Sequence, residues 1–263
     1  MEGQAAGAGM PNGARAWSPP LALDEWVKYR LVPGPAYIRF VAAKWAFRGE
    51  AELQLVRFLA DPDKTSLDIG ANEGVYSFVL RKHSAHVIAF EPNPKMARVL
   101  RSWAPGEGID VRECALSNES GTATLRLPVT RRGYSNQEGS LSTTKVSGDY
   151  GEVTVRTARL DDLDLRDVGF MKIDVEGFER EVLEGARETI ARERPTLLIE
   201  MEERHTKRAI EAQLADVLAL GYHGYFLKRH RSLAPLSAFD PERDHRRPLR
   251  RSDYVFNFVF LPA

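Results

Sequence analysis

Carboxylate side chains lie in or directly after four apolar, strand-like runs of this sequence. Asp68 lies within the first run and Glu91 follows the second, while Asp174 and Glu200 follow two later ones. Ligands of open α/β sheets bind outside the carboxyl ends of the strands, so these positions are placed to meet a ligand. A carboxylate there can accept the hydroxyl protons of a ribose or take the proton of a reacting hydroxyl.

The segment 66–94 is typical of a strand, a glycine turn, a helix and a second strand. Glu91 lies about 20 residues after the turn at Gly70, the distance at which a carboxylate binds a nucleoside ribose. A dinucleotide motif would need a third glycine beside the pyrophosphate, and the sequence has none there. Asp68 and Glu73 would repel a pyrophosphate but suit a sulfonium and an ammonium, the charges of S-adenosylmethionine (SAM). The alternative is an ordinary βαβ turn followed by a surface glutamate.

Three carboxylates and a lysine are the candidates for catalysis. A hydroxyl is a poor nucleophile at neutral pH, so a reaction at a hydroxyl would need a base to take its proton. Asp174 is the first candidate because it ends a central strand, and Glu176 and Glu200 can face the same crevice, with Lys172 pointing back along the strand. Crowded carboxylates raise one another's pKa and can also bind Mg²⁺. We predict a site without a metal and keep Mg²⁺ as the alternative.

The segment 129–151 has no regular apolar pattern but is rich in hydroxyl and amide side chains. Two interpretations stay open. It is a mobile surface loop, or its side chains, among them Ser135, Ser140 and Ser142, hydrogen-bond a polyhydroxylated acceptor.

Alternating strand-like and helical segments predict an α/β fold. We expect a doubly wound, Rossmann-like sheet of seven mostly parallel strands, with an antiparallel C-terminal hairpin formed by 222–227 and 254–261. The alternating segments 122–127 and 153–158 predict two further strands that extend over the cavity. The charged segment 228–251 is expected to be a solvated loop.

Composition divides the chain into a predicted flexible tail (1–20), an N-terminal helical cap (21–62) and a SAM-binding domain (63–263). Within the cap, Leu23, Trp26 and Val27 mark one helical face, and 37–47 supplies the apolar residues of a second helix. We expect these residues to pack against the main sheet; the alternatives are a membrane-surface role and a lid over the substrate.

Charge and composition limit the classes of partner that the chain is expected to have. Among 263 residues, Lys plus Arg (37) equals Asp plus Glu (37), so no overall positive charge favours nucleic acid. Cys114 is the single cysteine, which excludes an intrachain disulfide. No apolar run reaches the ~18–20 residues that cross a bilayer, and the N-terminus lacks a secretory pattern. We predict a cytoplasmic protein without a transmembrane segment and leave homo-oligomerisation open.

Several motifs, in this order and spacing, resemble the FkbM-type family of SAM-dependent methyltransferases. The similarity lies in Leu67–Ser77, Ala89–Pro94, Ala115–Ser117 and Leu160–Leu163, and it is strongest in Met171–Glu179. It covers roughly residues 50 to 204. One departure follows Glu200, where the family has a histidine sooner than His205.

The resemblance implies the class I methyltransferase fold and methyl transfer from SAM, mostly to oxygen, on sugars, glycolipids, polysaccharides or natural products. The residues we expect around the cofactor are Asp68, Gly70, Ala71, Asn72, Gly74, Tyr76, Glu91, Pro92, Glu113, Cys114, Ala115 and Asp174. The acceptor is then a hydroxylated small molecule or glycan. Two alternatives are a nucleotide-dependent oxidoreductase of similar topology and a catalytically silent SAM-binding domain.

Overall fold

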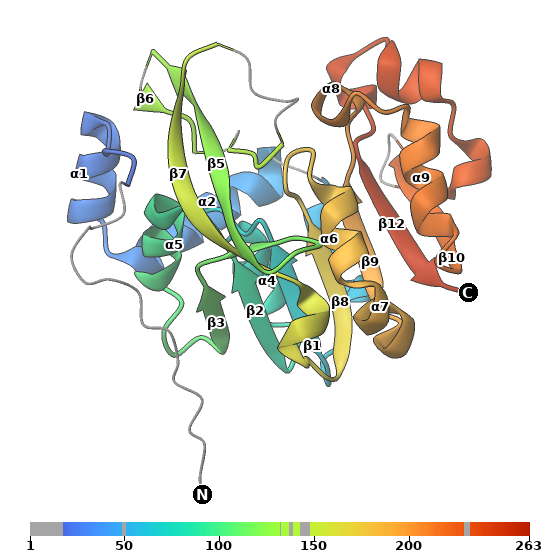
Figure 1. Ribbon diagram of the computed structural model, residues 1–263, viewed down its shortest axis with the longest axis horizontal. Helices are drawn as coiled ribbons and strands as arrows, with labels where there is room; N and C mark the ends of the chain where they lie inside the picture. Colours follow the sequence, from blue (N-terminus) through green and yellow to red (C-terminus); the bar gives the residue numbers. More distant parts are fainter. Residues whose placement is uncertain (1–17, 49–50, 132, 137–138, 143–147, 229–231) are drawn as a thin grey trace, which may run out of the picture.

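The computed structural model describes residues 18–48, 51–131, 133–136, 139–142, 148–228 and 232–263. The predicted tail, 1–20, lies outside these ranges except for its last three residues. Figure 1 shows a central twisted sheet with helices on both faces and a long two-stranded ribbon beside it. None of the helices in the described ranges is long and apolar enough to cross a membrane.

The main sheet has eight strands in the order β11-β10-β12-β9-β8-β1-β2-β3. The strands from β3 to β9 in this order are parallel, while β12 is antiparallel to both β9 and β10. Their bounds are β1 (Thr65–Ile69), β2 (His86–Phe90), β3 (Ile109–Arg112), β8 (Val168–Ile173), β9 (Thr196–Glu200), β10 (Tyr222–Lys228), β11 (Ser232–Pro235) and β12 (Asn257–Pro262). The mostly parallel sheet and its antiparallel C-terminal pair are therefore confirmed.

The prediction that 228–251 is a solvated loop was wrong in part. β11 adds an eighth strand at the edge of the sheet by pairing with β10, and a π-helical turn (Pro241–Arg246) follows. His245 in this turn is buried, and its Nδ1 lies 2.7 Å from the carbonyl oxygen of Val255. These contacts could not be predicted from the sequence, because the few buried residues lie among many arginines and do not form a periodic apolar pattern.

The strand order reverses at β1, which creates the crevice that the sequence predicts. β1 pairs with β2 on one side and with β8 on the other, and the chain builds β3 outward from β2 and β9 outward from β8. The connections after β1 and β8 therefore diverge at the carboxyl ends of these strands. Such a switch point is where open α/β sheets bind ligands.

A second sheet, in the order β4-β7-β5-β6, stands over this crevice (Figure 1). Its strands are β4 (Ala115–Leu116), β5 (Gly121–Thr130), β6 (Gly133–Tyr134) and β7 (Tyr150–Ala158). β5 and β7 pair antiparallel, as expected, but each is longer than predicted because the start and end of 129–151 continue the ribbon. The four alternating residues Leu125, Leu127, Val153 and Val155 bury its inner face.

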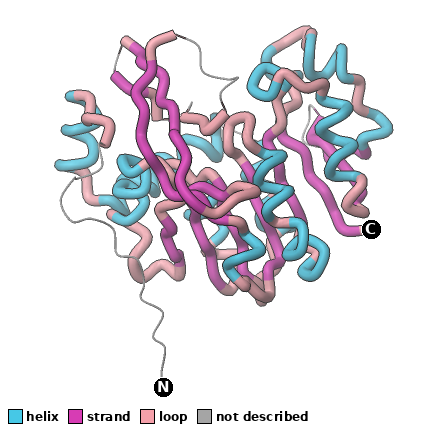
Figure 2. The backbone as a smooth tube through the Cα atoms, in the orientation of Figure 1, coloured by secondary structure: helices cyan, strands magenta, loops and turns pink. Residues whose placement is uncertain are grey.

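Helices cover both faces of the main sheet, as Figure 2 shows in cyan around the magenta strands. One apolar core joins the sheet to α2 (Gly34–Arg48), α4 (Val75–Leu80) and α5 (Pro94–Arg101). The other core joins it to α6 (Glu179–Gly185), α7 (Arg187–Glu193) and α9 (Ile210–Leu218). Within β2, Ile88 and Phe90 enter the second core, whereas Val87 and Ala89 enter the first, because successive side chains of a strand alternate between faces.

Three helical segments are short or interrupted. The segment 51–59 forms a 3₁₀ turn (Ala51–Gln54) and the short α3 (Val56–Leu59), and α6 and α7 are separated at Ala186. The short α8 (Glu203–Thr206) precedes α9, which begins at Ile210. Lys207 separates α8 from α9 with a positive φ of 57°.

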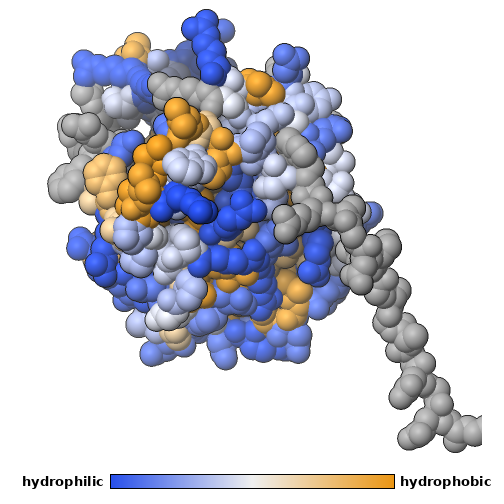
Figure 3. All heavy atoms as spheres, turned by 90° about the vertical axis from the view of Figure 1, so that its left-hand side faces the viewer, coloured by the Kyte–Doolittle hydropathy of each residue, from blue (hydrophilic) through white to orange (hydrophobic). Residues whose placement is uncertain are grey.

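The two N-terminal helices behave differently. Tyr37, Ile38 and Val41 of α2 are buried against the main sheet, as predicted. The apolar side of α1 (Leu23–Leu31) is exposed instead: Leu23 and Leu31 are 80% and 68% accessible. Figure 3 shows apolar side chains gathered on this side of the molecule.

Candidate active site

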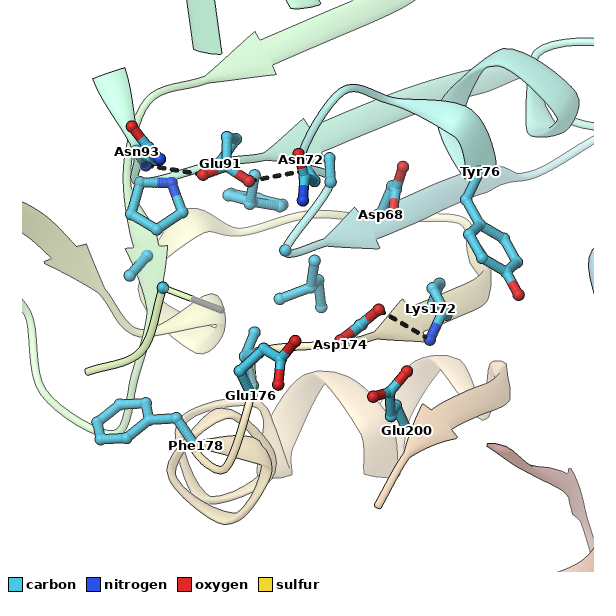
Figure 4. A pocket seen from close by; sticks show the side chains of 18 of the residues that line it. Asp68, Asn72, Tyr76, Glu91, Asn93, Lys172, Asp174, Glu176, Phe178 and Glu200 are labelled. Carbon is cyan, nitrogen blue, oxygen red and sulfur yellow. Dashed lines mark hydrogen bonds and ion pairs between the residues drawn. The ribbon is translucent and has the colours of Figure 1, made fainter. Parts of the chain in front are cut away.

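A cavity of about 430 Å³ lies at the carboxyl ends of β1, β2, β8 and β9. Its volume is within the ~300–1,000 Å³ range of small-molecule sites. Figure 4 shows the carboxylates of Asp68, Glu91, Asp174, Glu176 and Glu200 around this space. Asp68, Glu91 and Glu200 come from the ends of β1, β2 and β9, and Asp174 and Glu176 both come from the turn after β8. Leu125 of the β5–β7 ribbon also lines the cavity, as expected from the sequence.

Gly70 brings the ends of β1 and β8 into contact. Its φ is +82°, and a Cβ atom at this position would lie 1.8 Å from the carbonyl oxygen of Asp174. The backbone N–H of Asp174 donates to the carbonyl of Ile69 at 2.9 Å. A side chain at Gly70 would separate the glycine turn from Asp174, so glycine at this position keeps the two halves of the site together.

Glu91 is held rigidly in the wall of the cavity. Its Oε2 accepts from the backbone N–H of Asn72 and its Oε1 from that of Asn93, both at 2.7 Å. A carboxylate has about four lone-pair sites, so each oxygen can accept a further hydrogen bond from a ligand hydroxyl. Burial raises the pKa of Glu91 to about 7, although the two backbone hydrogen bonds act in the opposite direction.

Asp68 joins β1 to α4 beneath the cavity. Its Oδ2 accepts from both the backbone N–H and the hydroxyl of Ser77, and only 2% of the residue is exposed. Burial raises the pKa of Asp68 to about 6, against the hydrogen bonds from Ser77 and the charge of Lys172.

Asp174 and Lys172 lie on the same face of β8 and both point into the cavity (Figure 4). Lys172 Nζ lies 3.6 Å from Asp174 Oδ2 and donates to Asn257 Oδ1 at 3.3 Å. Lys172 is 1% exposed, whereas the Asp174 side chain is 28% exposed. The expected direction of Lys172, back along the strand, was wrong because residues two apart on a strand share a face.

Glu176 reaches the cavity through an unusual backbone conformation, with φ at +58°. Its Oε2 lies 3.2 Å from Nδ1 of His205, and His205 Nε2 lies 3.8 Å from Glu202 Oε1. His205, buried between two carboxylates, thus positions Glu176. Glu176, Glu200 and His205 also offer ligand atoms within 4.8 Å of one another, so this corner is the part of the described site that could hold a metal.

The polar side of α1 covers the glycine turn. Glu25 pairs with the buried Lys95 at 3.0 Å and accepts from the amide of Asn136. Tyr29 donates its hydroxyl proton to Glu73 at 2.8 Å. These contacts explain why α1 exposes its apolar side: its polar side chains are bound to the rim of the cavity.

Three asparagines in the cavity wall carry buried polar atoms without a hydrogen-bond partner among the described residues. The atoms are Asn72 Oδ1, Asn93 Nδ2 and Asn136 Oδ1. A buried unpaired polar group costs about 1–3 kcal/mol. A polar ligand that supplies donors and acceptors at these points would recover this cost, so the wall fits a nucleoside or amino-acid group.

The structure brings together most of the predicted site residues. All four predicted catalytic residues line the cavity, namely Lys172, Asp174, Glu176 and Glu200. Of the predicted cofactor residues, the cavity is lined by Asp68, Gly70, Ala71, Asn72, Tyr76, Glu91, Pro92, Cys114, Ala115 and Asp174. Gly74 and Glu113 are not among its lining residues: Gly74 packs against α5, and Glu113 pairs with Arg101.

The three predicted substrate serines lie elsewhere. Ser135 and Ser140 line neither this cavity nor a second one beside it, whereas Ser142 lines the second. Ser140 is 1% exposed, and its hydroxyl donates to the carbonyl of Glu176 at 2.7 Å. Asn136, Gly139 and Leu141, from the same segment, do line the main cavity.

Sequence reasoning missed a group of lining residues near the C-terminus. They are Glu202, Arg204, Arg251, Tyr254 and Phe256. Because β12 is antiparallel to β9, the chain just before β12 meets the carboxyl end of β9. The alternation of Tyr254 and Phe256 before the last strand was the signal available. Tyr254 donates to Glu202, which Arg204 also contacts at 2.5 Å.

The sequence profile described as the methyltransferase FkbM domain matches residues 68–227, more than half of the chain. The chain belongs to the FkbM methyltransferase family. The resemblance drawn from the motifs is therefore confirmed, and so is the class I methyltransferase fold. The oxidoreductase alternative finds no support in this family.

Two relatives carry names that describe their reactions. The FkbM domain is 28% identical over 164 residues to the 2-O-methyltransferase NoeI of Sinorhizobium fredii, covering 54% of this chain and 65% of the relative. It is 32% identical over 160 residues to the hexuronic acid methyltransferase AglP of Haloferax volcanii, covering 56% and 62%. The matches thus span less than two thirds of either relative's length.

One of the solved structures that match this chain is the methyltransferase FkbM of Methylobacillus flagellatus. It is 15% identical, its TM-score is 0.46, and the match covers 89% of this chain and 58% of the other.

Proposed function

We propose that this protein is a SAM-dependent O-methyltransferase whose acceptor is a hydroxyl of a sugar, a glycolipid, a polysaccharide or a hydroxylated natural product. One observation carries the proposal: Glu91 and Asp174 line the same cavity, at the point where the strand order reverses. A rigid carboxylate for a ribose and a more exposed carboxylate for an acceptor then face one space.

The cavity wall suits the charges and polar groups of SAM. Glu91 accepts the ribose hydroxyls, and the acidic side chains of Asp68 and Asp174 favour a sulfonium and an ammonium. The unpaired amide atoms of Asn72 and Asn136 offer further hydrogen bonds. SAM, when bound, would supply a methyl group on its sulfonium, and the neutral thioether left after the C–S bond breaks is a good leaving group.

The protein then has to orient the acceptor and remove its proton. Asp174 is the proposed base because its carboxylate is partly exposed to the cavity, in contrast to Glu91 and Asp68. Lys172, at 3.6 Å, holds this carboxylate in place. Glu176 and Glu200 bind acceptor hydroxyls beside it. The β5–β7 ribbon contributes Leu125 to the wall of the cavity.

The names of the two relatives support a sugar as the acceptor. One is called a 2-O-methyltransferase and the other a hexuronic acid methyltransferase. Methylation of a sugar hydroxyl needs a base and an open, polar acceptor side, and the Asp174 side of the cavity has both.

Asp174→Asn tests the proposal. A general base contributes ~10²–10⁴-fold, so we expect turnover with labelled SAM to fall by about this factor. The affinity for S-adenosylhomocysteine (SAH), measured by calorimetry, should change far less than turnover because Glu91 still binds the ribose. Unchanged turnover in the variant would remove Asp174 as the base. Full SAH binding with no methylation of any sugar nucleotide, lipid-linked glycan or hydroxylated natural product would favour the silent domain.

The metal alternative has its own test. We expect EDTA to leave methylation unchanged, because Asp174 removes the proton without a cation. Activity that is lost with EDTA and restored by Mg²⁺ would instead assign a cation to Glu176, Glu200 and His205.

A further inference from the structure

A second cavity, of about 340 Å³, adjoins the main one. Leu141 and Phe178 line both cavities, so together they form the partition between them. Part of the lining of the second cavity comes from the start of α6, and another part comes from Thr206 at the end of α8, Arg208 in the link to α9 and Gln213 of α9. The partition places this cavity beside the turn that carries Glu176, on the acceptor side of the site.

Glu179 in this wall has one carboxylate oxygen without a partner. Oε1 accepts from the backbone N–H of Gly177 at 2.8 Å, while Oε2 is buried and has no hydrogen-bond partner in the described part of the chain. Only 5% of Glu179 is exposed. A carboxylate at the start of a helix can be explained by its interaction with the free backbone N–H groups there. This accounts for Oε1 of Glu179, which accepts from Gly177, but it does not account for Oε2.

Burial raises the pKa of Glu179 to about 7, and the nearby Asp174 and Glu176 act in the same direction. Near neutral pH the carboxyl group is therefore present in both forms. It can accept a hydrogen bond from a ligand hydroxyl, or donate one to a ligand oxygen.

The charges of the cavity disfavour a phosphate as its ligand. Arg180 Nε is paired with Glu184 at 2.8 Å, and Arg208 Nη2 is paired with Asp216 at 2.8 Å. Exposed ion pairs of this kind are weak, but an anion would also face the acidic side chains of Glu179, Glu181 and Asp216 in the lining.

The remaining lining combines polar edges with apolar surface. Gln213 is 5% exposed, and its Nε2 donates to the carbonyl of Arg208 at 2.9 Å. Phe178, Leu183 and Met201 supply apolar surface. A sugar ring has hydroxyls at its edge and C–H groups on its faces, so this combination suits an uncharged sugar residue.

We propose that the second cavity binds a sugar residue of the acceptor next to the one that is methylated, with Glu179 hydrogen-bonded to a hydroxyl of that residue. This inference rests on the proposed function, because it assumes a glycan acceptor. It makes the protein an enzyme that selects at least two linked sugar residues.

The test compares the affinities of single sugars and their disaccharides for the SAH-loaded protein. The probes are glucose with cellobiose and N-acetylglucosamine with chitobiose, measured by calorimetry. In the pair that binds, we expect the disaccharide to bind at least about tenfold more tightly than the single sugar. Glu179→Leu should reduce this ratio to about threefold or less.

Two further variants and a measurement of SAH binding serve as controls. Glu179→Gln keeps a hydrogen-bonding group and should retain more of the ratio than Glu179→Leu. Glu188→Gln, exposed on α7 and outside both cavities, should keep all of it. SAH affinity reports whether each variant is folded, independently of sugar binding.

The possible failures are distinguishable. A ratio near one in the unaltered protein, or a ratio that Glu179→Leu leaves unchanged, would overturn the inference while the proposed function stands. Normal SAH binding without binding of any sugar would overturn the glycan acceptor and this inference together.

Discussion

The two acids that define the site are held by different means. Glu91 accepts two backbone hydrogen bonds and is 6% exposed, so its oxygens cannot change position. Asp174 is held by one lysine, and its side chain is 28% exposed. A fixed carboxylate suits the binding of a ribose, and an accessible one suits proton transfer, so the environment of each supports its proposed role.

Glu91→Gln should weaken SAH binding. A hydrogen bond to a charged group contributes about 1.5–3 kcal/mol, which corresponds to an increase of ~10–150-fold in Kd. Glu113→Gln is the matched control, because Glu113 pairs with Arg101 and is not among the cavity-lining residues. Calorimetry with SAH measures both. Equal affinities of the two variants would mean that Glu91 does not bind the cofactor.

The stability of the protein should depend on pH through Glu91. Its pKa is raised from 4.5 to about 7 in the folded protein, so between these values the folded state binds more protons than the unfolded state. The free energy of unfolding contributed by this group therefore falls as the pH rises through this window, by up to ~3 kcal/mol. Glu91→Gln lacks this dependence. Urea denaturation at pH 5 and pH 7.5 measures it, and identical pH profiles of the two proteins would contradict the assignment.

At the scale of elements, the close contact between β1 and β8 forms the site. Gly70→Ala places a Cβ atom 1.8 Å from the carbonyl oxygen of Asp174, so the strand ends must separate. Gly106 has nearly the same φ, +81° against +82°, but has no atom within 4 Å of an added Cβ. Gly106→Ala therefore measures the cost of the backbone conformation alone, about 1–3 kcal/mol.

We expect Gly70→Ala to cost more than ~4 kcal/mol, or to prevent folding, and to abolish SAH binding. Thermal denaturation and calorimetry of the two variants provide the comparison. Similar losses in both variants would show that the contact with Asp174 is not what requires glycine at position 70.

The elements that were predicted from the sequence are those with a strong local pattern. β1, β2, β8 and β9 combine apolar residues with a carboxylate at or after the strand end, and their parallel order follows from the helices between them. The side of α1 that faces the protein was not predictable, because its contacts depend on residues far away in the chain, such as Lys95 and Asn136. Periodicity identifies the apolar side of a helix, but it does not say which side has a partner.

The acceptor side was predicted less well for the same reason. Ser135, Ser140 and Ser142 were chosen by residue type, and of these three Ser142 alone lines one of the two cavities described above. Tyr254 and Phe256 reach the site because an antiparallel strand brings the chain back to the carboxyl end of β9. Such a return depends on strand order, which local sequence does not encode.

At the scale of the whole molecule, the cavity joins segments from most of the chain. Trp45 of α2, the ends of four strands, the β5–β7 ribbon and the residues before β12 all line it. A ligand that contacts all of these segments in the folded state, and none of them in the unfolded state, must stabilise the entire fold. This stabilisation by a bound ligand can therefore test the identity of the cofactor in the absence of any acceptor.

SAH should therefore raise the melting temperature. At 100 times its Kd, a ligand that binds one site of the folded state adds ~2.7 kcal/mol to the free energy of unfolding. For a domain of roughly this size, each kcal/mol corresponds to about 2–4 °C, which predicts a shift of roughly 5–10 °C. NADH at the same concentration is the control and should produce no shift, because Asp68, Glu73 and Asp174 repel a pyrophosphate. Stabilisation by NADH without stabilisation by SAH would mean that the acids of this cavity serve a different cofactor.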